Sequence, residues 1–315
     1  MAEQQISGAR LVVATAKEME EWEMDDFWKR TGWFGLAVAA LAASMALQIV
    51  LGVIAMLPAS IIAGMQAGAQ GITDPMQIQD MVMEKTLGAA SVGVLLYHVC
   101  SLPIFGLWYY FGCGRPKAGN PVRILKARGI IATQVAGFGL CLVANGIAMM
   151  IRYLAPAVFV EYMELMEAAG MGENPLTIFA AVILAPIGEE ILCRGIVLYY
   201  GMKMAQGIGS ERVSFWIANV LQALLFGIMH GNVVQGTYAF VLGMGLGLLY
   251  RRYHSLYPAM LCHFAINFLS TFVMGYLFGW VPENLFGTVI VFVLGAGVTL
   301  LAVILAGKKC EEVLR

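Results

Sequence analysis

The sequence predicts an all-α polytopic membrane protein with about eight transmembrane helices, from its composition and from the length of its apolar stretches. Hydrophobic residues make up 60% of the chain and charged residues 12%, with a mean hydropathy of +0.78. Soluble domains average roughly 25% charged residues, and a helix needs about 20 mainly apolar residues to cross a bilayer. The candidate spans lie near residues 33–57, 87–112, 129–151, 176–200, 213–230, 236–250, 256–279 and 286–306.

The segments between the spans give the expected organisation outside the membrane. Residues 1–32 are acidic and lack the apolar core of a cleaved signal. Their interleaved Met and Trp side chains fit either an interfacial helix or a solvated segment. The stretches 64–86 and 152–175 are expected to be loops, the second with a short surface helix. The scattered cysteines contain no CxxC pair, which favours small buried hydrophobes over a disulfide set or a metal cluster.

Basic residues in the short loops predict that both termini are cytosolic. Five Lys or Arg residues lie in the 113–129 loop, and more follow in the later loops on that side and in the C-terminal tail. The opposite loops hold only Lys85 and Arg152. We therefore expect an integral membrane protein, in the cell membrane, with the lipid bilayer as its surroundings and no nucleic-acid partner.

Three polar islands, here meaning polar clusters within apolar spans, interrupt the second half of the chain. The first, APIGEEILCRG, holds Glu189, Glu190 and Arg194, and an ionisable residue inside a membrane is by default a functional-site hypothesis. Glu190 and Arg194 share a helix face and can pair, whereas Glu189 is rotated by about 100° and stays available. Pro186 predicts a kink just before the carboxylates. A structural ion pair between helices is the simpler alternative, but it leaves Glu189 unexplained.

The second and third islands place histidines on two further spans. Phe226 and His230 share one helix face, and His263 and Asn267 share another. Alone, each pair is explained by a carbonyl-bonded His at a helix end or by an interhelical polar clamp. Together with Glu189 they supply a carboxylate, two imidazoles and an amide, which can activate water and hold an oxyanion. Glu189, His230 and His263 can equally hold zinc, although the HExxH helix of many zinc proteases is absent.

Two other features are less informative. His254 lies in a basic loop and is expected to be solvated, and His98 in the second span fits a satisfied core residue better than a cavity-lining one. Gly243 and Gly247 form a GxxxG pattern that permits close helix packing but is weak evidence for dimerisation.

The three islands resemble the ordered motifs of the CAAX protease and bacteriocin-processing (CPBP) family of intramembrane glutamate-dependent proteases, also called type II CAAX prenyl endopeptidases. The motif residues are Glu189-Glu190-xxx-Arg194, Phe226-xxx-His230 and His263-xxx-Asn267. Each motif alone is weak, but three in this order, each in its own apolar span, make a specific match over roughly residues 175–272. The resemblance leaves metal dependence open.

The resemblance implies a role for each motif residue. Glu189 would work with His230 to activate water, and His263 and Asn267 would stabilise the oxyanion. Arg194 would hold the second glutamate or contact the substrate. The supporting residues would be Glu190, Arg194 and Phe226.

On this interpretation the chain divides into four parts. These are a cytosolic N-terminal segment (1–32), accessory helices one to three with their loops (33–172), an intramembrane protease core of helices four to seven (173–272), and the last helix with a cytosolic tail (273–315). The expected function is hydrolysis of a peptide bond in a membrane-associated protein or peptide. A proton-coupled transporter and a non-catalytic immunity or scaffold protein of the same fold are the alternatives.

From the sequence alone, His230 is expected at a different depth in the membrane from Glu189 and His263, which conflicts with a shared site. Glu189 and His263 are expected at matching depths, but His230 lies about 17 residues into its span, nearer the outer face. For the site to close, the fifth span must begin below the membrane surface, or the fourth and fifth spans must tilt. A long cytosolic extension through residues 195–215 would satisfy this requirement.

Overall fold

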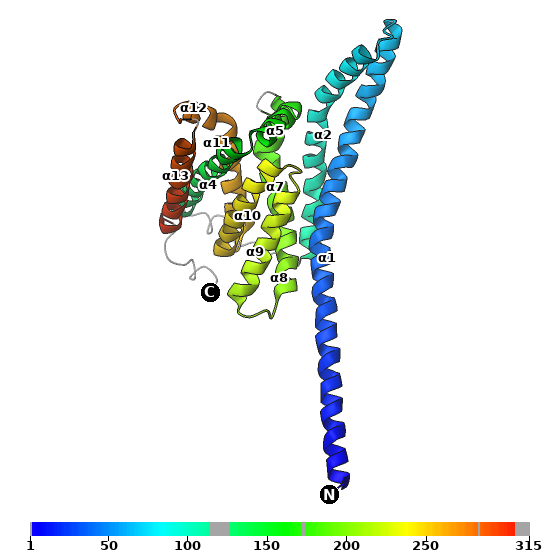
Figure 1. The fold of residues 1–315 in the computed structure, drawn as a ribbon, viewed down its shortest axis with the longest axis vertical. Coiled ribbons are helices and arrows are strands. Elements are labelled where there is room, and N and C mark those ends of the chain that lie inside the picture. The colour runs from blue at the N-terminus through cyan, green and yellow to red at the C-terminus, as the bar shows by residue number, and fades with distance from the viewer. Residues whose placement is uncertain (1, 114–126, 172–173, 283, 306–315) are drawn as a thin grey trace.

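The computed structural model describes residues 2–113, 127–171, 174–282 and 284–305, and over these ranges its regular secondary structure is entirely helical. Two long helices, α1 (Ala2–Ala69) and α2 (Pro75–Gly112), stand beside a bundle formed by the rest of the chain (Figure 1). Most of the basic 113–129 loop and the tail basic residues lie outside the described residues. The predicted all-α class is confirmed.

The bundle contains the remaining helices, three of which join into one continuous run. Its helices are α4 (Ala127–Leu154), α5 (Pro156–Ala168), α6 (Pro175–Phe179), α7 (Ala185–Glu190), α8 (Leu198–Ala205), α9 (Glu211–Ile228), α10 (Val233–Tyr253), α11 (Leu256–Phe272), α12 (Met274–Phe278) and α13 (Leu285–Leu305). Two π-helical segments, η1 (Ala180–Leu184) and η2 (Ile191–Val197), link α6, α7 and α8.

Six helices of the described chain are long and apolar enough to cross a membrane, by length and composition. They cover 26–69, 75–112, 129–154, 175–205, 233–253 and 285–305. The other two predicted spans correspond to α9, with 18 residues, and to the shorter apolar helix α11, with 17 residues. The protein is therefore an integral membrane protein, with two core helices shorter than a usual span.

The expected 64–86 loop is largely wrong, because helix occupies most of it. The α1 helix continues to Ala69, and α2 begins at Pro75, directly after an N-cap. The Asp74 carboxylate accepts a hydrogen bond from the Met76 N–H at 3.0 Å, and proline is well suited to the first helical turn. The predicted short helix in 152–175 is present as α5, and the N-terminal segment is helical from Ala2 without a break before the first span.

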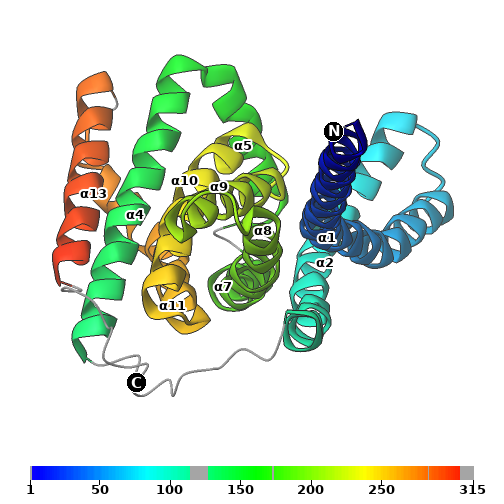
Figure 2. The ribbon, with the colours of Figure 1, turned by 90° about the horizontal axis from the view of Figure 1, so that it is seen from below.

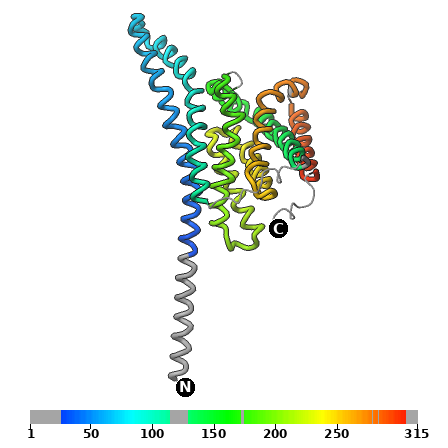
Figure 3. Tube along the Cα trace, turned by 180° about the vertical axis from the view of Figure 1, so that it is seen from behind, coloured from blue at the N-terminus to red at the C-terminus, as the bar shows by residue number. Residues whose placement is uncertain are grey.

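The α1 helix packs on α8 and η2, and α2 packs on α6, α7 and η2, so both long helices lie along one side of the bundle (Figure 3). A buried hydrogen bond between the Ser44 and Tyr97 hydroxyls, at 2.6 Å, joins α1 to α2. The Trp108 indole N–H on α2 donates to the Tyr200 hydroxyl on α8 at 3.0 Å, and the Trp33 ring on α1 stacks on that of Tyr200. These contacts fix the two long helices against the helix that carries the first polar island.

The GxxxG glycines pack inside the bundle. A Cβ at Gly243 would lie 3.0 Å from Ala223 on α9, and one at Gly247 would overlap the Asn219 side chain. Gly243 and Gly247 therefore let α10 approach α9 closely, and in this arrangement they do not form an outward-facing dimerisation surface.

Candidate active site

The helix that carries Glu189 and Glu190 leaves α geometry on both sides of them. At the end of η1 the Ala185 N–H bonds to the Ala180 carbonyl, five residues back. Pro186 follows and has no N–H, so the Ala181 carbonyl lacks the donor that the next residue would supply. The Asn267 side-chain amide, from α11, donates to this carbonyl at 2.8 Å. The kink expected at Pro186 is therefore observed as a π turn in the helix. The Asn267 side chain, from the third island, supplies the hydrogen bond that the Ala181 carbonyl lacks at this turn.

Glu190 and Arg194 form the predicted ion pair. Arg194 Nη1 lies 2.8 Å from Glu190 Oε1, and both side chains are fully buried. Arg194 Nη2 also donates to the Gly243 carbonyl at 3.3 Å, and the guanidinium lies over the Phe226 ring, 4.5 Å from its centroid. The first and second islands are therefore joined through a cation–π contact.

His263 lies between the two glutamates. Its Nδ1 is 2.9 Å from Glu190 Oε1, and its Nε2 is 3.8 Å from Glu189 Oε2. Because an ionised carboxylate only accepts hydrogen bonds, Glu190 fixes a proton on Nδ1 and leaves Nε2 of the neutral ring as an acceptor facing Glu189. His263 can donate from Nε2 to an oxyanion only when the ring carries both protons.

His230 follows the end of α9, and a backbone carbonyl orients its ring. Its Nδ1 lies 2.7 Å from the Phe226 carbonyl, so Nδ1 donates and Nε2 is left able to accept a proton. The Phe226 ring contacts both imidazoles edge-on, at centroid distances of 4.9 Å to His230 and 5.8 Å to His263. His230 is within electrostatic range of Glu189, His263 and Arg194.

Glu189 remains available, as its position on the helix predicts. Its side chain is 14% exposed, and among the described residues its ion-pair contact is the 3.8 Å approach to His263. Glu189 thus keeps an exposed edge, whereas the neighbouring Glu190 is fully buried.

The conflict over the depth of His230 is resolved by the common turn between α8 and α9. These helices extend together from one end of the bundle (Figure 1). At 1.5 Å per residue, Glu189 lies about 24 Å from the end of α8 at Ala205, and His230 about 28 Å from the start of α9 at Glu211. The two residues thus reach similar heights, as the proposed extension through 195–215 requires.

The sequence also allowed zinc at Glu189, His230 and His263. Among the residues that the structure describes, no group of three or more His, Cys, Asp or Glu side chains is gathered closely enough to hold a metal ion as they stand. Each of the three would need an atom about 2.0–2.2 Å from one zinc ion. The Nδ1 atoms of both histidines are engaged, by the Phe226 carbonyl and by Glu190, so Nε2 is the ring atom that each could offer.

Sequence reasoning missed several buried polar groups near the islands. Gln222 Nε2 on α9 donates to the Gly243 carbonyl at 2.9 Å, the same acceptor that Arg194 uses, and to Asn219 Oδ1 at 2.8 Å. The Tyr238 hydroxyl pairs with that of Tyr162 on α5 at 3.3 Å. Asn219 and Gln222, three residues apart in an apolar helix, are a signal that could have been recognised.

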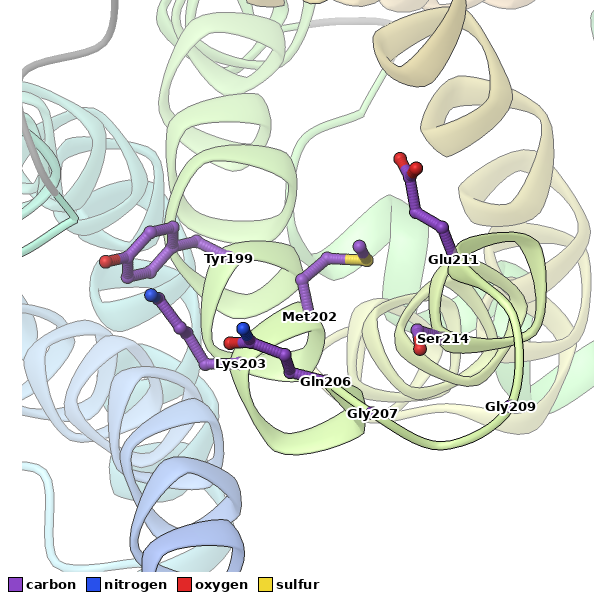
Figure 4. A pocket seen from close by; sticks show the side chains of 8 residues that line it. All are labelled: Tyr199, Met202, Lys203, Gln206, Gly207, Gly209, Glu211 and Ser214. Atoms are coloured by element: carbon purple, nitrogen blue, oxygen red, sulfur yellow. The ribbon is translucent and has the colours of Figure 1, made fainter.

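A surface pocket of about 350 Å³ lies at the α8–α9 turn and is separate from the islands (Figure 4). Its lining residues are Tyr199, Met202, Lys203, Gln206, Gly207, Gly209, Glu211 and Ser214. None of the motif residues takes part in it.

Comparison with known proteins supports the resemblance of the motifs. Residues 172–269 match a family model described as "Type II CAAX prenyl endopeptidase Rce1-like". A Bacillus subtilis (strain 168) protein named "Putative membrane peptidase YdiL" is 27% identical over 150 residues, which is 46% of this chain and 55% of that protein. The aligned part thus spans about half the length of this relative, and no solved structure matches the chain. Residues 172–269, which contain all three polar islands, are therefore similar to the type II CAAX prenyl endopeptidase (Rce1-like) family, and the relative named as a membrane peptidase agrees with this similarity.

Proposed function

We propose that this protein is a CPBP-type intramembrane endopeptidase that hydrolyses a peptide bond of a membrane-associated protein or peptide. The observation that carries the proposal is the contact of the Phe226 ring with both His230 and His263, together with the 3.8 Å approach of His263 to Glu189, within apolar helices. Residues 173–272 would form the protease core, and 33–172 would supply accessory helices.

The first chemical step is attack of water on the scissile carbonyl. Glu189, assisted by His230 through its free Nε2, takes a proton from water while the water oxygen bonds to the carbonyl carbon. The carbonyl π electrons move to oxygen and form a tetrahedral oxyanion. The proton held at the Glu189–His230 pair then passes to the amide nitrogen as the C–N bond breaks, which releases an amine and a carboxylic acid.

The oxyanion needs hydrogen-bond donors that are already in place. Asn267 has two amide N–H groups, of which one bonds to the Ala181 carbonyl, so the second can serve the oxyanion. His263 adds a second donor in the step when its ring carries a proton on Nε2 as well as on Nδ1. Asn267 thus serves both the helix backbone and the proposed transition state.

The test is cleavage by the purified protein in lipid vesicles. A farnesylated CAAX peptide and an unmodified apolar peptide of equal length are incubated with wild-type protein, and products are identified by mass spectrometry. Cleavage that is lost in Glu189→Gln but kept in Glu84→Gln, an exposed carboxylate of α2, supports the proposal. No cleavage of either peptide, or equal cleavage by Glu189→Gln, contradicts it and leaves the transporter or the scaffold.

We further infer that both termini are cytosolic and that the α8–α9 turn faces the cytosol, because Lys203 and Arg212 flank that turn. The expected result is that a cysteine at Glu211 reacts with a membrane-impermeant thiol reagent only from the cytosolic side. Labelling from the outside would reverse the orientation.

A further inference from the structure

The α1 helix is longer than the membrane that it crosses. From Trp33 to Ala69 it carries no charged residue, and at 1.5 Å per residue this uncharged part is about 55 Å long. The hydrocarbon core of a bilayer is about 30 Å thick. At a tilt of about 40°, the upper end of the range for membrane helices, the uncharged part still extends about 42 Å along the membrane normal. One end of it must therefore leave the hydrocarbon core.

Contacts with the bundle show which end this is. The Trp33 ring stacks on that of Tyr200 on α8, and the Ser44 hydroxyl bonds to that of Tyr97 on α2, so the first part of the uncharged stretch lies beside the bundle. The far ends of α1 and α2 project past the bundle and lean away from it (Figures 1 and 3). Seen from below, they lie to the side of the bundle (Figure 2). The end at Ala69 is therefore the one that leaves the core.

The charged residues of α2 lie in the projecting part. They are all exposed, and they are Asp80, Glu84 and Lys85. A Cβ at Gly93 would lie 3.1 Å from Gly52 Cα, and in an antiparallel hairpin this register places Lys85 opposite residue 60 of α1. Charge is costly in hydrocarbon, so both helices have left the core by this level. Pro58, just before it, lacks an N–H and permits α1 to bend there.

The arm, here meaning residues 58–69 of α1 with residues 75–86 of α2, has an apolar face on its α1 side. Ile61, Ile62 and Met65 are 50–70% exposed on it. A contiguous exposed apolar patch marks an interaction site. The arm therefore presents a surface that water alone would leave uncovered.

This apolar face continues the lipid-facing surface of the α1 span. Val50, Ile54, Leu57, Ile61 and Met65 follow one another at intervals of three or four residues, so they form one stripe along the helix. All five are more than half exposed. The lower part of the stripe lies at the depth of the bilayer and faces lipid there. The upper part extends the same surface without a charged residue between them.

The α2 side of the arm is different. Met76, Asp80 and Glu84 are spaced by four residues, share one face and are exposed. The arm is therefore amphipathic, as helices that lie in a membrane interface are. Its charged residues are two acids and one lysine, so apolar burial, and not attraction to anionic headgroups, would hold it at a membrane.

We propose that the arm lies on the membrane surface beside the bundle, at the end opposite the α8–α9 turn, and that its partner is the bilayer itself. The α1 face with Ile61 and Met65 contacts the lipid of the near leaflet, and the α2 face with Asp80 and Glu84 is turned to water. This interaction is independent of the chemistry proposed for the polar islands.

The experiment measures oxidation of native methionines in wild-type protein, held as one copy in each phosphatidylcholine nanodisc. Met65 and Met76 are nearly equally exposed in the protein alone, at 70% and 74%, so their surroundings decide the difference. Chloramine-T, a water-soluble anionic oxidant, converts accessible methionine to the sulfoxide. Mass spectrometry of peptides gives the rate at each residue.

We expect Met65 to be oxidised about tenfold more slowly than Met76, because susceptibility follows exposure to the oxidant. Equal rates would overturn the proposal. Protection of Met65 only in discs that hold two copies would also overturn it, and would identify this face as a contact between copies.

A pair of variants tests the orientation of the arm, with thermal unfolding as the check that each is folded. Ile61→Glu places a charge on the lipid face and should bring the Met65 rate to within about threefold of the Met76 rate. Gln77→Glu adds the same charge at an exposed residue of α2, and Met65 should stay protected. Protection that survives Ile61→Glu would contradict a lipid contact at this face. Because no peptide is cleaved in these measurements, they separate this inference from the proposed function.

Discussion

Replacement of Glu190 by Gln tests whether the two adjacent glutamates have different tasks. Glu190 Oε1 accepts hydrogen bonds from Arg194 Nη1 at 2.8 Å and from His263 Nδ1 at 2.9 Å. Glu190 and Arg194 are 0% exposed, and His263 is 5% exposed. Without the negative charge, Arg194 keeps the Gly243 carbonyl, the Phe226 ring and the amide oxygen of the new Gln as partners, but loses its ion pair with Glu190.

The expected cost follows from this burial. Breaking a buried ion pair by removal of one partner costs about 3–5 kcal/mol, because a charge is left uncompensated in a low-dielectric site. Glu189→Gln removes no hydrogen bond below 3.5 Å among the described residues and should cost less than about 1 kcal/mol. Its turnover, however, should fall by about 10²–10⁴ because the proposed general base is lost.

The assay measures the free energy of unfolding and the turnover of both variants in the same detergent. The double variant Glu190→Gln with Arg194→Met is the control, since it removes the unpaired charge as well as its partner. It should recover most of the stability that Glu190→Gln loses. If Glu189→Gln retains near-wild-type turnover while Glu190→Gln is folded but inert, the two roles are reversed and the reasoning is refuted.

Three further predictions concern the helix backbone, metal dependence and helix packing. Asn267→Ala should cost about 1–3 kcal/mol, because it leaves the half-buried Ala181 carbonyl without its donor, and it should lower turnover as well; unchanged unfolding and turnover would refute both roles. Chelator-treated protein should keep its activity, because in the proposed mechanism Glu189 and His230 activate water without a metal; loss of activity that zinc restores would refute that mechanism. Gly243→Ala should cost about 1–3 kcal/mol through overpacking, because the new Cβ would lie 3.0 Å from α9 and 3.3 Å from Phe226. Gly106→Ala, which meets nothing within 4 Å, is its control in the same unfolding measurement.

Local sequence patterns predict a large part of this molecule. The spacing of Glu190 and Arg194 alone gives their ion pair, because four residues always bring side chains onto one helix face. The apolar stretches locate the spans, but their ends are less certain. The stretch 64–86 contains Gly and Pro, which suggested a loop, yet it is mostly helical. Proline is also common in the first turn of a helix, and here Pro75 begins α2 directly after its Asp74 N-cap.

The contacts between islands were beyond the sequence. The resemblance implies roles for Glu189, His230 and His263, but no pattern in the sequence predicts that His263 donates a hydrogen bond to Glu190. The rotation of α11 against α7 decides this, and only the three-dimensional packing sets that rotation. For the same reason no pattern in the sequence showed that Nδ1 of His98 lacks a partner.

The π turn at η1 makes the site dependent on the length of its helix as well as on its residues. A π turn holds one residue more than an α turn, so everything after Leu184 is displaced by one position relative to an uninterrupted helix. Deletion of one residue from Ala180–Leu184 would let the helix return to α geometry while the two halves keep roughly their relative rotation. A further inserted residue cannot be absorbed in this way and would turn the preceding half by about 100° relative to the glutamates. In this segment an insertion should therefore be more damaging than a deletion or than most substitutions, even though none of its five apolar side chains carries a reactive group.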